Sequence, residues 1–350
     1  MPGPTNDVAS SLYRVLMHDV ALEIDQLAAD TSFAGVVRVD RGDTIEFERA
    51  YGLAHRGLNV ANTVQTQFGI ASGTKGLTAL TVMSLIEDGV LSLSTTARSL
   101  LGTDLALVSN EVTVEHLLTH RSGVGDYIDE DEGFAFSDYL MTVPVHRLDN
   151  VEAYLPMLEG RQAKAAPDET FSYNNSGYVI LALLAERASG RAFADLVDQR
   201  VCRRAGMTST SFLRSDELPG RAAVGYLLPD GLRNNSLHLP VRGSGDGGAY
   251  STVADIRALW TAFFAGQIVS PSSVAAMVRP RSYATNEKLG YGLGFWLHDS
   301  RAAVKLEGYD AGVSFRSWHD PELDITQTVV SNWSDSAWAI AKRLNDILTT

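Results

Sequence analysis

Short strand-like segments lie near both ends of this chain, whereas the long stretch between them is patterned for helices. Residues 33–39 and 44–51 are rich in apolar and β-branched residues and are separated by a polar turn, so they predict a hairpin. Four further β segments come late in the chain, at 291–297, 302–307, 313–318 and 325–331. Because isolated strands cannot bury their apolar faces, we predict that both groups share one antiparallel sheet.

Apolar residues recur at helical spacing through much of the remaining chain. The segments predicted as helices are 9–30, 77–86, 112–119, 148–158, 175–189, 192–203 and 335–349. We therefore expect an α+β fold, an α/β sandwich in which an antiparallel sheet is flanked by the N- and C-terminal helices. In this arrangement 1–70 and 245–350 form the sheet domain, 71–244 form an inserted and mostly helical domain, and the active site lies in the cleft between them.

The size and charge of the chain exclude several classes of protein. Its 350 residues, 45% of them hydrophobic, can bury a large core, and no apolar stretch is long enough to span a membrane. A formal charge of −13 disfavours nucleic acid and anionic lipid as partners. A single cysteine, Cys202, excludes an intramolecular disulfide, and the first residues lack the pattern of a secretion signal. We expect a soluble, cytoplasmic protein.

Neither a metal nor a nucleotide cofactor is indicated. Of the eight histidines only His116 and His120 stand close together, among apolar and hydroxyl residues, and no His-Glu-x-x-His zinc motif occurs. The glycine-rich segment 243–248 lacks the Lys-Ser/Thr ending of a phosphate loop. We therefore expect no cofactor.

The pair Ser72 and Lys75 forms the only Ser-x-x-Lys in the chain, which has five lysines. Residues three apart lie on one face of a helix, so the hydroxyl and the amine would be within reach of each other. An amine held away from water can take the hydroxyl proton and activate the serine as a nucleophile. An N-cap serine followed by a solvated lysine explains the same spacing equally well.

Two later segments offer partners for such a nucleophile. Tyr173, just before a predicted helix, could present its hydroxyl to a cleft, and an ammonium nearby would lower its pKa. Asn175 could hold either the amine or a substrate amide. A strand end at 306–312 contains glycine, which permits a close backbone approach and an oxyanion-binding N–H. Taken singly, Tyr173 is also typical of a packed aromatic, Asn175 of a helix cap and the segment 306–312 of a turn between strands.

The acidic segment 126–140 has no clear period. It is typical of a solvated surface loop, and the alternative is a lid over a pocket.

These motifs, taken in order, resemble those of the serine β-lactamase and DD-peptidase family, nearest to its class C β-lactamases, DD-carboxypeptidases and related esterases. Ser72-x-x-Lys75 resembles the family's nucleophile motif, and Tyr173-Asn174-Asn175 its Tyr-x-Asn. Three further stretches of family-like sequence are 117–123, 247–255 and 291–294. The matches run from about residue 30 to 335 and imply a β-lactamase/transpeptidase-like fold. The resemblance also implies that His120 is structural.

The resemblance implies a role for each matching residue. Ser72 would be the acyl-accepting nucleophile. Lys75 would act as its base, or as the charge that keeps Tyr173 partly ionised, and Tyr173 would pass the proton to the leaving group. Asn175 would orient the lysine and the substrate. The N–H groups of Ser72 and Tyr309 would bind the oxyanion.

One position departs from the family pattern. Where the family has Lys-Thr-Gly or His-x-Gly, this chain has Leu306-Glu307-Gly308. A leucine in place of the pocket-facing cation cannot hold a substrate carboxylate, which penicillins and D-Ala-D-Ala ends require. Asp310, in contrast, could recognise an amine-bearing substrate.

We therefore predict a serine hydrolase that acts through an acyl-enzyme on a neutral small-molecule ester, as an esterase or acyl transferase. One alternative is a β-lactamase or D-amino-acid peptidase or amidase that holds the carboxylate elsewhere, with Arg316 as a candidate. Another is a sensor or binding protein that is acylated without turnover. The expected partner is a small ester or amide, and the sequence does not indicate an oligomeric state.

Overall fold

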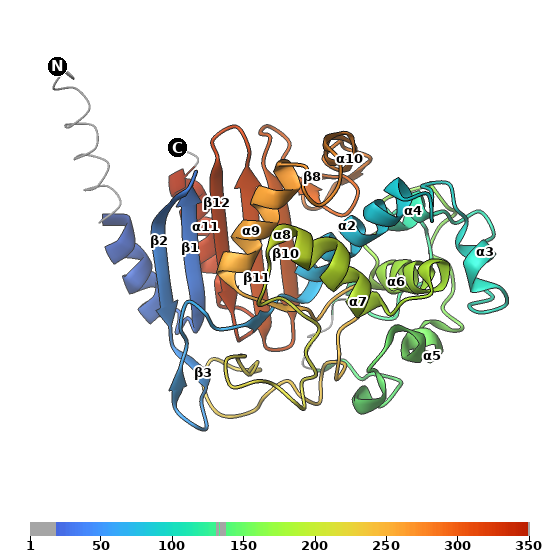
Figure 1. Ribbon diagram of the computed structural model, residues 1–350. Helices are drawn as coiled ribbons and strands as arrows, with labels where there is room; N and C mark the ends of the chain where they lie inside the picture. The colour runs from blue at the N-terminus through green and yellow to red at the C-terminus, as the bar shows by residue number, and fades with distance from the viewer. Residues whose placement is uncertain (1–18, 131–132, 134–137, 349–350) are drawn as a thin grey trace, which may run out of the picture.

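The computed structural model describes residues 19–130, 133 and 138–348, and it contains the antiparallel sheet expected from the two chain ends (Figure 1). Eight strands pair in the order β2-β1-β12-β11-β10-β9-β8-β7, and every neighbouring pair is antiparallel. They are β1 (Gly35–Arg41), β2 (Thr44–Tyr51), β7 (Ser282–Ala284), β8 (Leu289–Tyr291), β9 (Trp296–Leu297), β10 (Val304–Asp310), β11 (Val313–Asp320) and β12 (Ile325–Ser331). The predicted strand at 291–297 is divided into β8 and β9, and β7 was not predicted.

The two ends of the chain cover one face of the sheet. The helix formed by residues 19–30 and the C-terminal helix α11 (Ala337–Leu348) pack there side by side, against alternate side chains of β1 and β12 (Figure 1). Their core includes Ile24, Val37, Val329 and Leu344, all 0% exposed. The first part of the predicted helix 9–30 lies outside the described residues.

The other face of the sheet is covered by the middle of the chain. Its helices are α2 (Thr74–Glu87), α3 (Ala97–Leu101), α4 (Val114–Leu118), α5 (Leu155–Leu158), α6 (Asn175–Ser189), α7 (Phe193–Val197), α8 (Arg203–Ala205), α9 (Val253–Phe264) and α10 (Pro271–Met277). Helix α2 is buried at every position from Thr74 to Leu85, because it lies between the sheet and the remaining helices. Each helix predicted in this part of the chain is present in part or in full. The division into two domains remains a prediction.

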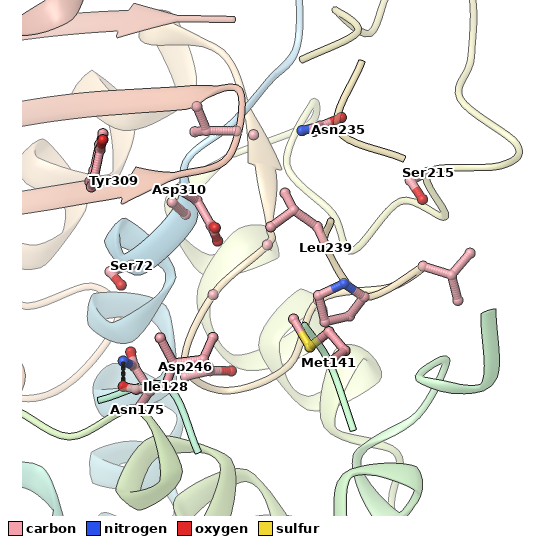
Figure 2. Close-up of a pocket in the computed structure, with 18 of the residues that line it drawn as sticks. Ser72, Ile128, Met141, Asn175, Ser215, Asn235, Leu239, Asp246, Tyr309 and Asp310 are labelled. Carbon is pink, nitrogen blue, oxygen red and sulfur yellow. Dashed lines mark hydrogen bonds between the residues drawn. The ribbon is translucent and has the colours of Figure 1, made fainter. Parts of the chain in front are cut away.

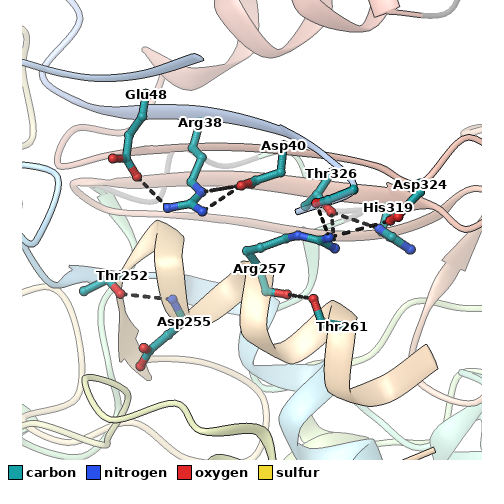
Figure 3. A network of polar contacts seen from close by, with 11 residues as sticks. Arg38, Asp40, Glu48, Thr252, Asp255, Arg257, Thr261, His319, Asp324 and Thr326 are labelled. Atoms are coloured by element: carbon teal, nitrogen blue, oxygen red, sulfur yellow. Dashed lines mark hydrogen bonds and ion pairs between the residues drawn. The ribbon is translucent and has the colours of Figure 1, made fainter. Parts of the chain in front are cut away.

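A polar network joins α9 to one end of the sheet (Figure 3). The Arg257 guanidinium donates to the Gly42 carbonyl (2.7 Å) and the Thr326 hydroxyl (3.2 Å), and lies 3.6 Å from the Asp324 carboxylate. His319 Nδ1 lies 2.9 Å from the same Thr326 hydroxyl. These contacts fix α9 to the turns between β1 and β2 and between β11 and β12.

Two small sheets complete the fold: β3 (Leu53–His55) with β4 (Val60–Ala61), and β5 (Phe68–Gly69) with β6 (Tyr250–Ser251). The second pair matters for function, since β5 runs directly into the turn that carries Ser72. Across 19–130, 133 and 138–348, no helix has the length and apolar character needed to cross a bilayer.

Candidate active site

Ser72 lies in a short 3₁₀ turn, η1 (Ala71–Gly73), directly before α2. The Ile70 N–H donates to the Ala249 carbonyl (2.9 Å), which ties the turn to the neighbouring glycine-rich segment. Ala71 has a φ of +43°, which is uncommon for a residue with a Cβ. Backbone strain of this kind concentrates at functional sites, because the surrounding structure must hold it in place.

The Lys75 side chain is buried and points at Ser72. Its Nζ lies within hydrogen-bonding distance of Ser72 Oγ (2.9 Å), Asn175 Oδ1 (2.7 Å) and the Asp246 main-chain carbonyl (2.8 Å). Only 2% of Lys75 is exposed, so the alternative of a solvated lysine is wrong. Burial lowers the pKa of Lys75, although nearby carboxylates oppose this effect. A neutral amine at this position can accept the serine proton.

Tyr173 lies next to the serine, whose side chain interacts with the Tyr173 phenol. The expectation that an ammonium would lower its pKa is wrong. Burial, followed by the charge of Glu130, raises the pKa of Tyr173 well above its usual range. The Lys75 Nζ lies over the face of the ring, 4.9 Å from its centroid, and so does not stabilise a phenolate oxygen directly. Tyr173 is therefore a neutral phenol.

Asn175 begins α6, and a buried carboxylate fixes this end of the helix. Asp126 accepts hydrogen bonds from the Asn175 N–H (2.7 Å) and from the N–H (2.9 Å) and hydroxyl (3.0 Å) of Ser176. The Asn175 Nδ2 donates to the Ile128 carbonyl (3.2 Å) and to Glu130 Oε1 (3.1 Å), which leaves its Oδ1 to face the lysine. Burial raises the pKa of Asp126 to about 6 despite these hydrogen bonds.

Replacing Asp126 by alanine should loosen this helix end. The change leaves buried donors of Asn175 and Ser176 without an acceptor, so we expect it to destabilise the protein by about 3 kcal/mol. Asp126→Asn keeps one acceptor oxygen and should be less severe. Urea unfolding of both variants checks the order. An Asp126→Ala protein as stable as the wild type would show that Asp126 does not anchor α6.

The expected solvated loop at 126–140 is wrong at its beginning, because Asp126, Tyr127 and Ile128 are all buried. Residues 131–132 and 134–137 lie outside the described residues, and with them part of the possible lid.

His120 packs beneath the tyrosine, and its ring centroid lies 4.5 Å from that of Tyr173. Its Nδ1 accepts the Asn174 N–H (3.0 Å), and its Nε2 lies 3.2 Å from the Tyr291 hydroxyl. These contacts use both ring nitrogens, consistent with the expected structural role. The other histidine of the pair, His116, serves in the cap of α4. Within the described ranges, no three His, Cys, Asp or Glu side chains gather in a way that could hold a metal ion.

Strand β10 approaches the serine closely at Gly308. A Cβ at this position would lie 2.1 Å from the Ile70 carbonyl oxygen and 2.9 Å from the Ser72 nitrogen. Only glycine allows this approach, as the sequence predicted. The next residue, Tyr309, is 37% exposed at the rim of the cavity, and its ring lies 5.9 Å from that of Trp338.

Leu306 does not take the substrate-facing position given to it from the sequence. It is 2% exposed and packs in the core over Gly76, where an added Cβ would lie 2.6 Å from Leu306 Cδ2. Its apolar side chain is accommodated between β10 and α2, away from the cavity lining. The position nevertheless supplies no cation to the site.

A cavity opens beside the serine (Figure 2). Its empty space, counting the open mouth, is about 810 Å³. Ser72, Asp246 and Asp310 lie on one side of the opening, and Leu239 and Met141 lie across from them.

Three carboxyl groups contribute to this lining: Glu130, Asp246 and Asp310. Asp246 receives the Tyr127 hydroxyl (2.6 Å), and burial raises its pKa. Burial raises the pKa of Asp310 to about 7, and the neighbouring carboxylates act in the same direction. Among the described residues that line the cavity, none is a lysine or an arginine. The cavity therefore disfavours an anionic substrate group.

The structure thus brings Ser72, Lys75, Tyr173 and Asn175 together, with Gly308, Tyr309 and Asp310 on the adjacent strand. Two functional positions were missed from the sequence, Asp126 and Asp246. Asp126 could have been found from the apolar residues on both sides of it. Asp246 lies among glycines, which signal close backbone packing.

Comparisons with known proteins agree with this geometry. The family model described as Beta-lactamase matches residues 20–348. The chain is 27% identical to penicillin-binding protein 4* of Bacillus subtilis over 82% of its own length, and 30% identical to esterase EstB of Burkholderia gladioli over 58%. It spans 65% and 52% of the lengths of these two relatives.

One solved structure matches this chain over nearly the full length of both proteins. The crystal structure of a penicillin-binding protein from Bacillus halodurans superposes with a TM-score of 0.86 at 33% identity, over 93% of this chain and 99% of that one. The family model, this likeness and the eight-stranded sheet with its buried Ser-x-x-Lys pair show that the chain belongs to the Beta-lactamase family.

Proposed function

We propose that this protein is a serine hydrolase that cleaves a small, uncharged or cationic ester through an acyl-enzyme on Ser72. The observation that carries the proposal is the Lys75 amine, buried and 2.9 Å from the Ser72 hydroxyl, beside an open cavity. In the proposed reaction, the serine oxygen attacks the ester carbonyl and Lys75 takes its proton. The leaving alkoxide receives a proton from Tyr173. Water then attacks the acyl-enzyme and gives a proton to the Tyr173 phenolate, and the Lys75 ammonium returns its proton to the Ser72 oxygen as the ester bond breaks.

The pKa directions support this division of roles. Burial favours the neutral, proton-accepting form of Lys75 and the neutral, proton-donating form of Tyr173. The N–H groups of Ser72 and Tyr309 are proposed to bind the oxyanion, since Gly308 lets the strand reach the serine backbone.

The charges around the cavity support a substrate without a carboxylate. Leu306 supplies no cation, and three carboxyl groups line the opening. A penicillin or a peptide with a free C-terminus would bring a carboxylate next to Asp246 and Asp310. Arg316, the residue considered for holding such a carboxylate, contacts Glu307 instead and does not line this cavity.

A panel of substrates tests the proposal. Short-chain p-nitrophenyl esters should be hydrolysed fastest, the matching anilides more slowly, and nitrocefin scarcely at all. Intact-mass spectrometry should detect a transient acyl adduct that is absent from Ser72→Ala. Ester hydrolysis that survives Ser72→Ala contradicts the proposal, and an adduct that forms without product release favours a sensor instead.

The acidic lining also favours an acyl group that carries an amine. The suitable test is a pair of esters, one with a quaternary ammonium group and the other its uncharged tert-butyl isostere. Asp310 has a pKa of about 7, so it is neutral at low pH and ionised above that value. The KM of the cationic ester should therefore fall as the pH rises through about 7, and the KM of the isostere should not. Asp310→Asn should remove the difference, and an unchanged KM for both esters would exclude this role.

A further inference from the structure

A second pocket lies on the face of the sheet covered by α11. It is bordered by β9, β10, β11 and α11, encloses about 760 Å³ with its mouth, and shares no lining residue with the cavity at Ser72. Two tryptophans and four basic side chains contribute to its wall: Trp296, Trp318, Arg301, Lys305, Arg316 and Lys342. We call these six residues the tryptophan groove. We propose that the groove binds a small planar carboxylate.

The charge of the groove is opposite to that of the protein as a whole. The chain carries a formal charge of −13 and has only five lysines, and two of them line this pocket. Two carboxylates lie close to these cations. Glu307 pairs with Lys305 (3.2 Å) and contacts Arg316, and Glu287 is one of the described residues that line the pocket. Four cations against two carboxylates leave the groove positive, so an anion is attracted to it.

Arg301 has hydrogen-bonding capacity that the described protein does not use. Its Nη2 donates to Asn345 Oδ1 (3.3 Å), whereas its Nη1 is buried and finds no acceptor among the described residues. A buried donor without an acceptor is unfavourable, and a bound oxygen would relieve this. The guanidinium is planar and forked, a geometry that matches a carboxylate.

Two indoles contribute apolar surface to the groove, the partly exposed Trp296 and the nearly buried Trp318. The Arg301 guanidinium lies 5.4 Å from the Trp318 ring centroid, and the Lys305 ammonium lies 5.5 Å from that of Trp296. A flat ring on the ligand would pack against these indoles while its carboxylate meets the cations. Ligands that combine an aromatic body with one charge therefore fit best.

Trp296 also connects the groove with the candidate active site. Its ring is nearly parallel to that of Tyr173, with 6.0 Å between the centroids and 12° between the planes. A ligand at Trp296 would therefore lie one aromatic ring away from the proposed proton donor. Binding can be followed through tryptophan fluorescence.

The test uses 2-naphthoate as the probe and its uncharged amide, 2-naphthamide, as the control. Titration calorimetry and fluorescence quenching of the full chain should give saturable binding of naphthoate with a Kd of about 10 μM to 1 mM. Naphthamide should bind at least tenfold more weakly. Raising the salt concentration should weaken naphthoate binding.

Variants locate the binding. Arg301→Gln and the exposed Lys342→Gln should each lower naphthoate affinity about tenfold, while ester hydrolysis and thermal stability stay at the wild-type level. Asp310→Asn, at the other cavity, should not change the affinity. Equal binding of the acid and the amide, or undiminished naphthoate binding in both groove variants, overturns the proposal. Loss of binding in Asp310→Asn alone would assign the probe to the Ser72 cavity and overturn it as well.

Discussion

Ser72→Ala and Lys75→Met are each expected to lower kcat/KM for a p-nitrophenyl ester by about 10⁴-fold, and the double variant should be no less active than either. The reason is geometric, since the lysine acts only on the serine proton, across a hydrogen bond of 2.9 Å. Once the hydroxyl is absent, the base has nothing to activate. Without the base, the hydroxyl is a poor nucleophile at neutral pH.

The measurement is a double-mutant cycle on kcat/KM with a matched control. Lys342→Met removes an exposed lysine outside the cavity and should leave the rate unchanged. Lys75→Arg keeps a cation but cannot give up its proton, so it should be nearly as inactive as Lys75→Met. Losses that multiply in the double variant would show that the two residues act independently and that Lys75 is not the base for Ser72.

Gly308→Ala is expected to destabilise the protein by about 3 kcal/mol and to lower kcat/KM by about 10²-fold. The added Cβ would lie 2.1 Å from the Ile70 carbonyl oxygen, which is a backbone atom, and the position of the Cβ is itself fixed by the backbone of residue 308. Rotation of a side chain cannot relieve this overlap, so β10 must move away from η1. That movement separates the Tyr309 N–H from the Ser72 N–H, which are proposed to bind one oxyanion together.

Gly290→Ala is the matched control in the same sheet. A Cβ at Gly290 would meet its nearest neighbour, Leu297 Cβ, at 3.5 Å, which is an ordinary contact. This variant should keep both the stability and the rate of the wild type. Urea unfolding gives the first quantity and ester hydrolysis the second. A Gly308→Ala protein that behaves like Gly290→Ala would show that β10 does not need its close approach to the serine.

The sheet was predictable from sequence because its strands carry local signals. The hairpin of β1 and β2 has two apolar segments around a short turn, and β10, β11 and β12 follow one another with turns between them. Strand β9 has only two residues, Trp296–Leu297, too few to show a period, so it was merged with β8. The π-helical turn at Asp198–Cys202, inside the predicted helix 192–203, leaves the apolar spacing unchanged and gave no signal.

The site was predictable only where spacing along the chain reflects distance in space. Ser72 and Lys75 satisfy this condition, since both lie on one helical turn. Strand alternation shows that successive side chains point to opposite faces of the sheet, but it does not show which face borders the cavity. The predicted substrate-facing position of Leu306 was therefore wrong. The prediction for the pKa of Tyr173 was wrong as well, since burial and then the charge of Glu130 raise it, and the lysine lies over the ring.

The sequence by itself determined the order of helices and strands, the antiparallel sheet from both chain ends and the pairing of the Ser72 hydroxyl with its neighbouring amine. These features depend on periodicity and on residues a few positions apart, which local geometry controls. Only the tertiary structure decided that Asp126, Asp246 and Asp310 surround the site, that Leu306 belongs to the core and that a basic groove lies behind Trp296. Burial and charge depend on segments that lie far apart along the chain, and folding alone brings them together.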